Sequence, residues 1–325
     1  MAEFDPKPWK APRAPGLVGE FEQNNLLSSA KLLPTPNHGP EDVVVDSAGY
    51  IYSGTEEVSI VRIWQDGSAR VVANVGGRPL GIEVYGDDLL VCNAALGLQA
   101  VSISGTVEVL TNSHDGTPLS LTNNASVASD GTILFTESSQ RWSLDDYTND
   151  IVEGRPTGRL LKRDPDGTTT QLFDGIAFAN GVALDSAEAS VFVAETARYR
   201  IHRYWLSGDK AGSTELFKDN LPGFPDNLSF SNGTLWVAFA SPRNPSIDAM
   251  SDKPVLKKLA VKLPEALKPK PLRHGFIAGF DEAGNVTHNL QDPSGIVAVT
   301  TGVREANGAL YIGALLDPHV AVVEL

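Results

Sequence analysis

The pattern of hydrophobic and polar positions repeats along most of the chain. Each repeat has a short polar entry, a strand of alternating apolar and polar residues, a turn containing Gly or Asp, and a second apolar strand. Six copies can be placed, at residues 39–56, 78–94, 122–139, 179–196, 225–241 and 301–315. Alternating hairpins follow the first, third and fourth copies, so the pattern predicts units of four short strands.

The spacing of the copies indicates how the units are arranged. The residues that open the first strand of each copy are Glu41, Leu80, Asn124, Asn180, Asp226 and Thr301, with intervals of 39, 44, 56, 46 and 75 residues. Most intervals are close to the roughly 40–50 residues of one propeller blade. We therefore predict an all-β fold, a six-bladed β-propeller with short helical insertions covering one end. An α/β barrel is disfavoured because amphipathic helices do not separate the strands.

The same pattern predicts the domain organisation. The proline-rich residues 1–30 are expected to form an extended arm, and residues 31–325 the propeller. We expect the final strand, VAVVEL, to complete the last blade together with the segment around Ala30 to Leu33. Insertions are predicted at about 139–156 and 242–275.

The second insertion contains the best helical pattern in the chain. Val255, Leu256, Leu259 and Leu263 recur at near-helical spacing, with lysines opposite them. Long excursions from a compact domain are often lids or binding loops. A helix that only covers one end of the propeller is an equally good interpretation.

Composition and charge narrow the class of protein. Hydrophobic residues make up 42% and charged residues 20% of the 325, which is typical of a folded domain. The net charge of −14 leaves no basic face to bind nucleic acid. The single cysteine, Cys92, excludes an internal disulfide and is expected in the core. Without a long apolar stretch or a secretory signal, we predict a cytoplasmic protein with a small-molecule substrate and no membrane partner.

Oxygen-bearing side chains concentrate at the positions that open the first strands. In a propeller these strands line the central channel, so their first residues converge at one end of the axis. The candidates are Glu41, Asn124, Asn180 and Asp226, with Asn123 and Asn227 adjacent. The Asn and Asp residues among them are common turn formers when taken alone. Together their oxygens suit Ca²⁺, although other divalent cations can use the same ligands. The chain has no HExxH, GxSxG, Walker or GxGxxG motif in a suitable context.

Several segments resemble the strictosidine synthase-like proteins. They are GPEDVVVDSAGYIYSGTE, GRPLGIEV, RPTGRLLKRDPDG, FANGVALD, VFVAETARYRIHRYWL, LPGFPDNLSF and LWVAFASPRNP. The likeness runs from about Gly39 to the C-terminus, and its longest stretch is 157–244. These proteins are six-bladed propellers within the wider group of gluconolactonases, regucalcin-type enzymes and paraoxonases, so the resemblance implies the same fold.

The resemblance also implies site residues. In the calcium-dependent lactonases of the group, a Glu, two Asn and an Asp from four blades hold the ion. Those roles fall on Glu41, Asn123, Asn180 and Asp226, and Asn227 matches an additional ligand of the paraoxonases. The family alignment therefore selects Asn123 where the spacing selected Asn124, and we expect Asn124 to face the substrate.

Two positions depart from the family. Thr301 stands where true strictosidine synthases have their catalytic glutamate, and Leu80 stands where paraoxonases have a histidine. Neither side chain can transfer a proton as those groups do. We expect both, with Asn124 and Asn227, to contact substrate.

These observations lead to a functional hypothesis with two alternatives. The hypothesis is a Ca²⁺-dependent hydrolase of a lactone or related ester, with Asp226 as general base. Loop residues Trp142, Tyr147, Phe178 and Met250 are expected to shape an apolar pocket rim. The alternatives are a non-enzymatic propeller that binds a partner and keeps a structural ion, and a carbon–carbon bond-forming lyase of the strictosidine synthase type.

Overall fold

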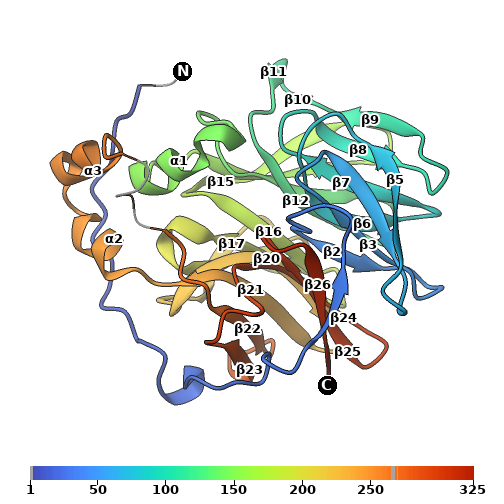
Figure 1. The fold of residues 1–325 in the computed structure, drawn as a ribbon. Coiled ribbons are helices and arrows are strands. Elements are labelled where there is room, and N and C mark those ends of the chain that lie inside the picture. The colour runs from blue at the N-terminus through green and yellow to red at the C-terminus, as the bar shows by residue number, and fades with distance from the viewer. Residues whose placement is uncertain (1–2, 265–267, 269) are drawn as a thin grey trace.

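The computed structural model describes residues 3–264, 268 and 270–325. Within them the chain forms six four-stranded antiparallel sheets arranged as the blades of a propeller (Figure 1). The first strands of the blades contact one another in the order β2, β6, β12, β16, β20 and β24, and β24 contacts β2 again. The predicted all-β, six-bladed propeller is therefore confirmed.

Each blade is a meander whose strands follow the chain order. Blade 1 contains β2 (Val43–Val45), β3 (Ile51–Gly54), β4 (Ser59–Ile63) and β5 (Ala69–Asn74). Blade 2 contains β6 (Pro79–Tyr85), β7 (Asp88–Asn93), β8 (Gly97–Val101) and β9 (Val107–Thr111). Blade 3 contains β12 (Thr122–Val127), β13 (Ile133–Glu137), β14 (Gly158–Arg163) and β15 (Thr169–Ile176). A small hairpin of β10 (Ser113–His114) and β11 (Thr117–Pro118) separates blades 2 and 3.

The last three blades follow the same plan. Blade 4 contains β16 (Ala179–Leu184), β17 (Ser190–Glu195), β18 (Arg200–Trp205) and β19 (Thr214–Lys218). Blade 5 contains β20 (Gly223–Ser231), β21 (Thr234–Pro242), β22 (Gly275–Phe280) and β23 (Val286–Asp292). Blade 6 contains β24 (Thr300–Ala306), β25 (Ala309–Ala314) and β26 (His319–Glu324), and its outer strand is β1 (Lys31–Pro34).

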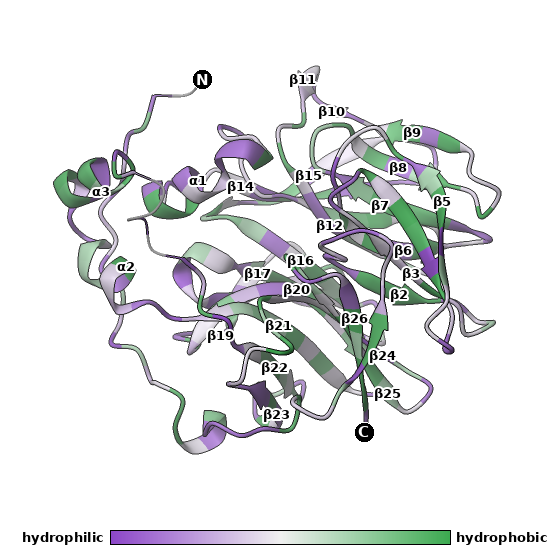
Figure 2. Ribbon diagram, in the orientation of Figure 1, coloured by the Kyte–Doolittle hydropathy of each residue, from purple (hydrophilic) through white to green (hydrophobic). Residues whose placement is uncertain are grey.

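The ring is closed by pairing a strand near the N-terminus with the C-terminal strand. β1 pairs antiparallel with β26, with Leu33 opposite Val320, as the sequence predicted for the C-terminal strand. Apolar side chains of neighbouring blades form the core between them, and Leu33 packs in the cluster shared by blades 6 and 1. Figure 2 shows the hydrophobic residues concentrated along the strands. Cys92 is fully buried, which confirms its expected place in the core.

The closing strand provides a test of how much this junction stabilises the fold. Leu33 is 1% exposed and its neighbour Leu32 is 38% exposed. We expect Leu33→Ala to lower the free energy of unfolding by about 3 kcal/mol, because it leaves a cavity between two blades. Leu32→Ala is expected to cost less than about 1 kcal/mol. Urea denaturation of both variants measures the difference, and equal small losses would show that β1 contributes little to closure.

Short helices occur mainly in the two insertions. The first contains η2 (Leu144–Asp146) and α1 (Tyr147–Glu153), and the second contains α2 (Pro245–Met250) and α3 (Pro254–Ala260). Two further 3₁₀ turns are η1 (Gly19–Phe21) and η3 (Thr196–Arg198). Figure 1 shows α1, α2 and α3 grouped at one side of the propeller, with the N-terminal segment running past α3 and α2. Residues 1–2 of the predicted arm and residues 265–267 and 269 of the predicted second insertion lie outside the described residues.

The orientation of α3 is the reverse of what its sequence pattern suggests. Val255 is 71% exposed and Leu259 is 59% exposed, whereas Lys257 is 4% exposed. The helix is therefore present where the spacing predicted it, but its apolar face does not pack on the propeller. Within the described part of the chain, no helix has the length and apolar character needed to cross a membrane.

Candidate functional site

Irregular strand pairing places the predicted site residues on the propeller axis. Regular pairing is interrupted between Thr122 and Ala125 on β12, and between Ala179 and Val182 on β16. A similar interruption lies between Pro225 and Leu228 on β20. Bulges of this kind turn side chains away from their normal alternation. The residues within these three interruptions include Asn123, Asn180 and Asp226.

Glycine next to the site residues allows the inner strands to approach closely. A Cβ on Gly181 would lie 2.4 Å from the backbone nitrogen of Leu228 on the neighbouring inner strand. A Cβ on Gly302 would lie 2.6 Å from Oδ1 of Asp42. Both contacts are shorter than a side chain permits, so Gly is required where blades meet at the axis.

Glu41 is buried, with 3% of its surface exposed, and it accepts hydrogen bonds at both its side chain and its backbone carbonyl. Nδ2 of Asn227 donates to Oε1 and Oε2 of Glu41, each at 3.2 Å. The Thr301 hydroxyl donates to the backbone carbonyl of Glu41 at 2.6 Å. Thr301 and Asn227 therefore orient Glu41, and Asn227 is not among the residues that line the pocket described below. The expected substrate contact by Asn227 is replaced by this supporting role.

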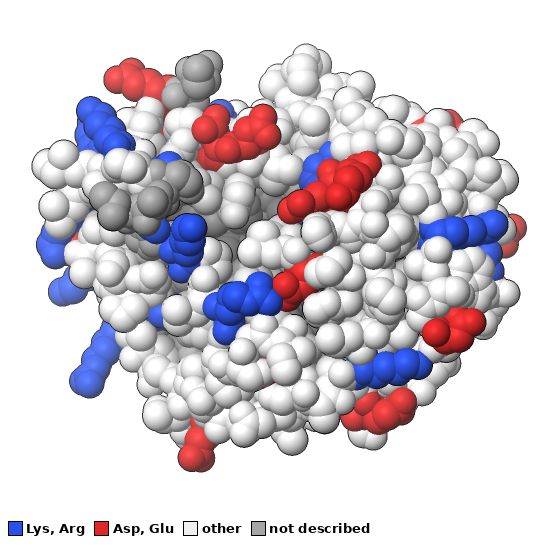
Figure 3. Space-filling model, viewed as in Figure 1, with Lys and Arg blue, Asp and Glu red and all other residues white. Residues whose placement is uncertain are grey.

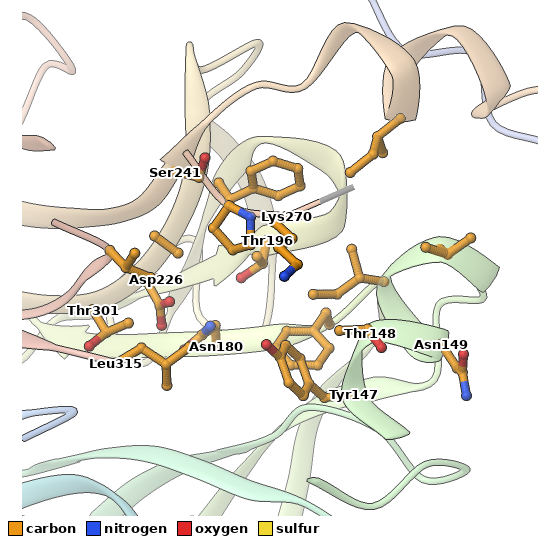
Figure 4. Close-up of a pocket in the computed structure, with 18 of the residues that line it drawn as sticks. Tyr147, Thr148, Asn149, Asn180, Thr196, Asp226, Ser241, Lys270, Thr301 and Leu315 are labelled. Atoms are coloured by element: carbon orange, nitrogen blue, oxygen red, sulfur yellow. The ribbon is translucent and has the colours of Figure 1, made fainter. Parts of the chain in front are cut away.

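Three amide oxygens around the axis have no hydrogen-bond partner among the residues that the structure describes. They are Oδ1 of Asn123, Asn180 and Asn227, whose side chains are 4%, 3% and 1% exposed. A buried polar oxygen left without a partner is costly, so a group of three suggests a ligand that the protein atoms do not supply. Figure 4 shows Asn180, Asp226 and Thr301 at the same end of the pocket.

The carboxylates at the axis are held in an unfavourable environment for charge. Burial raises the pKa of Asp226 to about 8, opposed by a hydrogen bond from Asn180. Burial, followed by the charges of Asp226 and Asp42, raises the pKa of Glu41 well above its ordinary value. Burial outweighs the favourable charge of Arg78 at Glu41, and a bound cation would lower the pKa of both carboxylates.

Asn124 has a different place from the one predicted. Its Nδ2 donates to Oδ2 of Asp42 at 3.1 Å, and its Oδ1 accepts from the Val182 amide at 3.0 Å. The side chain is 2% exposed and does not line the pocket. Asn124 therefore joins three blades through these two hydrogen bonds and does not reach the pocket.

Asp42 is a buried group that the sequence analysis missed. It is 4% exposed, and burial raises its pKa to about 6. Its carboxylate accepts from the amides of Val43 and Ile82, at 2.9 and 3.2 Å, besides the Asn124 bond. The adjacent acidic pair Glu41–Asp42 was the available signal, since two neighbouring carboxylates at a strand entrance are unusual for a turn alone.

A cavity of about 220 Å³ lies next to the predicted site residues at the axis. Its polar end contains Glu41, Asn123, Asn180, Asp226 and Thr301. The remaining wall is mainly apolar and includes Leu80, Leu121, Tyr147, Ile151, Phe178, Phe224, Ile247, Met250, Val299 and Leu315. Lys268 and Lys270 also line the cavity. On the surface, Figure 3 shows Lys and Arg side chains gathered at the side of the molecule where α2 and α3 lie. This combination of an apolar wall and a few convergent polar groups is typical of a small-molecule site.

Most of the predicted rim residues reach this cavity. Tyr147, Phe178 and Met250 line it, and Leu80 does as well. Trp142 does not line it, and its indole nitrogen instead donates to the Glu153 carboxylate at 2.9 Å. In the described residues, no group of three or more His, Cys, Asp or Glu side chains could hold a metal. A cation at the axis would therefore need the amide oxygens.

Comparison with known sequences places the chain in a family. The families described as "Strictosidine synthase" and "Strictosidine synthase-like, N-terminal" match residues 123–209 and 19–63. The adipocyte plasma membrane-associated protein of Gallus gallus is 34% identical over 354 residues, which cover 99% of this chain and 84% of that protein. Protein STRICTOSIDINE SYNTHASE-LIKE 6 of Arabidopsis thaliana is 31% identical over 300 residues, covering 89% of this chain and 79% of that protein. The chain belongs to the strictosidine synthase-like family.

Solved structures extend the similarity of this strictosidine synthase-like protein to its fold. A gluconolactonase from Xanthomonas campestris has a TM-score of 0.68 at 16% identity, covering 92% of this chain and 90% of that one. Regucalcin from Agrobacterium tumefaciens, a calcium-binding protein, has a TM-score of 0.64 at 13% identity, covering 91% and 93%. The predicted relationship to the gluconolactonase and regucalcin propellers is confirmed at the level of the fold.

Proposed function

We propose that the protein hydrolyses a lactone or related ester with the help of a divalent cation, Ca²⁺ in the first place. The observation that supports this most directly is the unpartnered amide oxygens of Asn123 and Asn180 beside the buried carboxylates of Glu41 and Asp226. These four residues meet at the polar end of one apolar cavity.

The residues fit a hard cation in both charge and ligand chemistry. Ca²⁺ takes about 6–8 oxygen ligands, and carboxylates with amide carbonyls are a common set. Two carboxylates would balance the charge of a divalent ion, which removes the cost of burying them. Glu41, Asn123, Asn180 and Asp226 would hold the ion, and water or substrate would complete its coordination. Such an ion, when bound, polarises an ester carbonyl and stabilises the charge that develops on its oxygen.

The chain's own groups account for the other requirements of hydrolysis. Asp226 can accept the proton of an attacking water through a carboxylate oxygen that does not bind the ion. Asn180 hydrogen-bonds to Asp226 and so orients it. The apolar wall binds the hydrocarbon part of the substrate and limits the access of other water molecules.

The lyase alternative receives no support from this site. Thr301 has no carboxyl group, and its hydroxyl is already used in the bond to the Glu41 carbonyl. Among the described residues that line the cavity, the acidic ones are Glu41 and Asp226, both at the axis. A non-enzymatic propeller with a structural ion remains the alternative that the experiment must separate.

The experiment combines metal removal with a substrate panel. The purified protein is analysed for bound metal, stripped with EGTA, and assayed against apolar lactones, aryl esters and sugar lactones. We expect hydrolysis of an apolar member, at least a 100-fold loss after stripping, and recovery with added Ca²⁺. Full activity in the stripped protein would contradict the proposal. Calcium binding without turnover of any substrate would favour the non-enzymatic alternative.

A further inference from the structure

A buried lysine outside the pocket joins three segments that are distant in the sequence. Nζ of Lys257 donates to the carbonyl oxygen of Lys7 at 2.9 Å and to that of Glu153 at 3.4 Å. Lys257 is on α3, Lys7 is in the N-terminal segment, and Glu153 is the last residue of α1. A cation hydrogen-bonded to the last carbonyls of a helix stabilises that end. Lys257 therefore connects both insertions to the N-terminal segment.

Glu153 forms a second junction at the same place. Its side chain is fully buried and accepts from the Asp5 amide at 2.6 Å and from the indole nitrogen of Trp142 at 2.9 Å. Arg141 approaches the same carboxylate at 3.3 Å. The Glu153 backbone carbonyl also accepts from the Lys7 amide at 3.0 Å. Both carboxylate oxygens are thus satisfied, as a buried charge requires.

The N-terminal segment continues from α1 to α2. The Trp9 amide donates to the Ser251 carbonyl at 3.1 Å, and the Ala11 amide donates to Oγ of Ser251, also at 3.1 Å. The guanidinium of Arg243 donates to the Pro12 carbonyl at 2.7 Å. We call residues 3–13 the strap. Figure 1 shows the N-terminal chain passing alongside α3 and α2.

The strap lies behind the wall of the apolar pocket. Four side chains line the pocket and also line a small second cavity that contains Trp9 and Lys257; they are Ile151, Val152, Ile247 and Met250. The wall formed by α1 and α2 is therefore a single layer, with ligand space on one side and the strap on the other. α1 has seven residues, too few to be stable without tertiary contacts at its ends.

We infer that Lys257 and the strap form a latch that holds α1 against α2 and α3 and so keeps the pocket wall closed around an apolar ligand. Lys257 is a positioning residue, because it does not line the pocket and acts through α1. The consequence for turnover rests on the proposed hydrolase function. The consequences for helix stability and ligand binding do not.

Lys257→Met tests the latch because it removes the ammonium group and keeps an unbranched apolar side chain. Hydrogen exchange of residues 147–154, followed by mass spectrometry, is expected to be at least tenfold faster, with exchange in the inner strands unchanged. Binding of the apolar fluorophore 1-anilinonaphthalene-8-sulfonate in the pocket is expected to weaken about fivefold. For an ester that is turned over, KM should rise while kcat stays within twofold. Lys258→Met is the matched control, since Lys258 is exposed and loses the same charge.

Trp9→Ala provides a second variant on the far side of the wall. It removes a strap side chain that packs near Tyr199, with ring centroids 6.1 Å apart, and that does not line the pocket. We expect the same faster exchange in 147–154, and a double variant no more affected than the larger single one. Equal exchange in Lys257→Met and Lys258→Met would overturn the latch, as would faster exchange in all blades. If no ester is hydrolysed but the exchange and binding results hold, the proposed function fails and the latch stands.

Discussion

Asp226→Asn is expected to lower kcat/KM for ester hydrolysis by about 10³-fold or more, because it removes both a general base and a metal ligand. The same change is expected to leave the metal-free protein as stable as the original or more stable. Asp226 is 8% exposed, and burial raises its pKa to about 8, so the carboxylate is costly when no cation is present. Asn keeps the shape of the side chain without the charge. Steady-state kinetics and thermal unfolding in EGTA measure the two effects.

The control for this variant is a buried aspartate away from the pocket. Asp185 is 7% exposed and accepts from the Ala189 amide and the Ser190 hydroxyl, at 2.8 and 2.6 Å. Asp185→Asn should lose some stability and keep its activity, which is the opposite result. If folded Asp226→Asn retains turnover, Asp226 is not the base.

The metal-free protein is expected to become less stable as the pH rises from about 4 to about 8. Asp226 has an ordinary pKa of 3.8 and a pKa of about 8 in the fold, and Asp42 is raised to about 6. Between these values the folded protein binds more protons than the unfolded chain, so increasing pH favours unfolding. We expect the Tm in EGTA to fall by roughly 5 °C or more over this range, since each kcal/mol changes Tm by about 2 °C in a chain of this size.

Calcium should reverse this dependence. A divalent cation binds the ionised carboxylates, so its stabilisation should be small at pH 5 and largest at pH 8. Differential scanning calorimetry at both pH values, once with EGTA and once with about 1 mM Ca²⁺, measures the change of Tm that Ca²⁺ causes. Glu41→Gln serves as the matched variant and should show a weaker effect of Ca²⁺. A Tm that is independent of Ca²⁺ at pH 8 would contradict a cation site at the axis.

The fold could be predicted from the chain because its information is local and repeated. A blade is a meander of neighbouring strands, so alternation and turns within each 40 to 50 residues are enough to define it. The closing pair of β1 and β26 was also predictable, because six copies leave one strand missing at one end and one extra at the other. The spacing of the apolar residues predicted the helix α3, but it did not predict which face of the helix is exposed.

Three residues of the candidate site could be predicted individually from the sequence, and the others only to within a neighbouring position. Equivalent positions of the blades identified Glu41, Asn180 and Asp226, which all line the polar end of the cavity. The choice between Asn123 and Asn124 depends on the irregular pairing between Thr122 and Ala125 of β12, because both residues lie within it. Asn227 was expected to touch substrate, but its amide group is directed to Glu41.

The sequence by itself establishes six repeated units and a set of oxygen-bearing residues at equivalent positions, since both depend on periodicity along the chain. Only the tertiary structure shows which oxygens lack partners, that α3 turns Lys257 inward, and that the N-terminal segment lies behind the pocket wall. Those features arise from contacts between residues up to 250 positions apart, as for Lys7 and Lys257. No local pattern encodes such contacts, because each is selected by the packing of the whole ring.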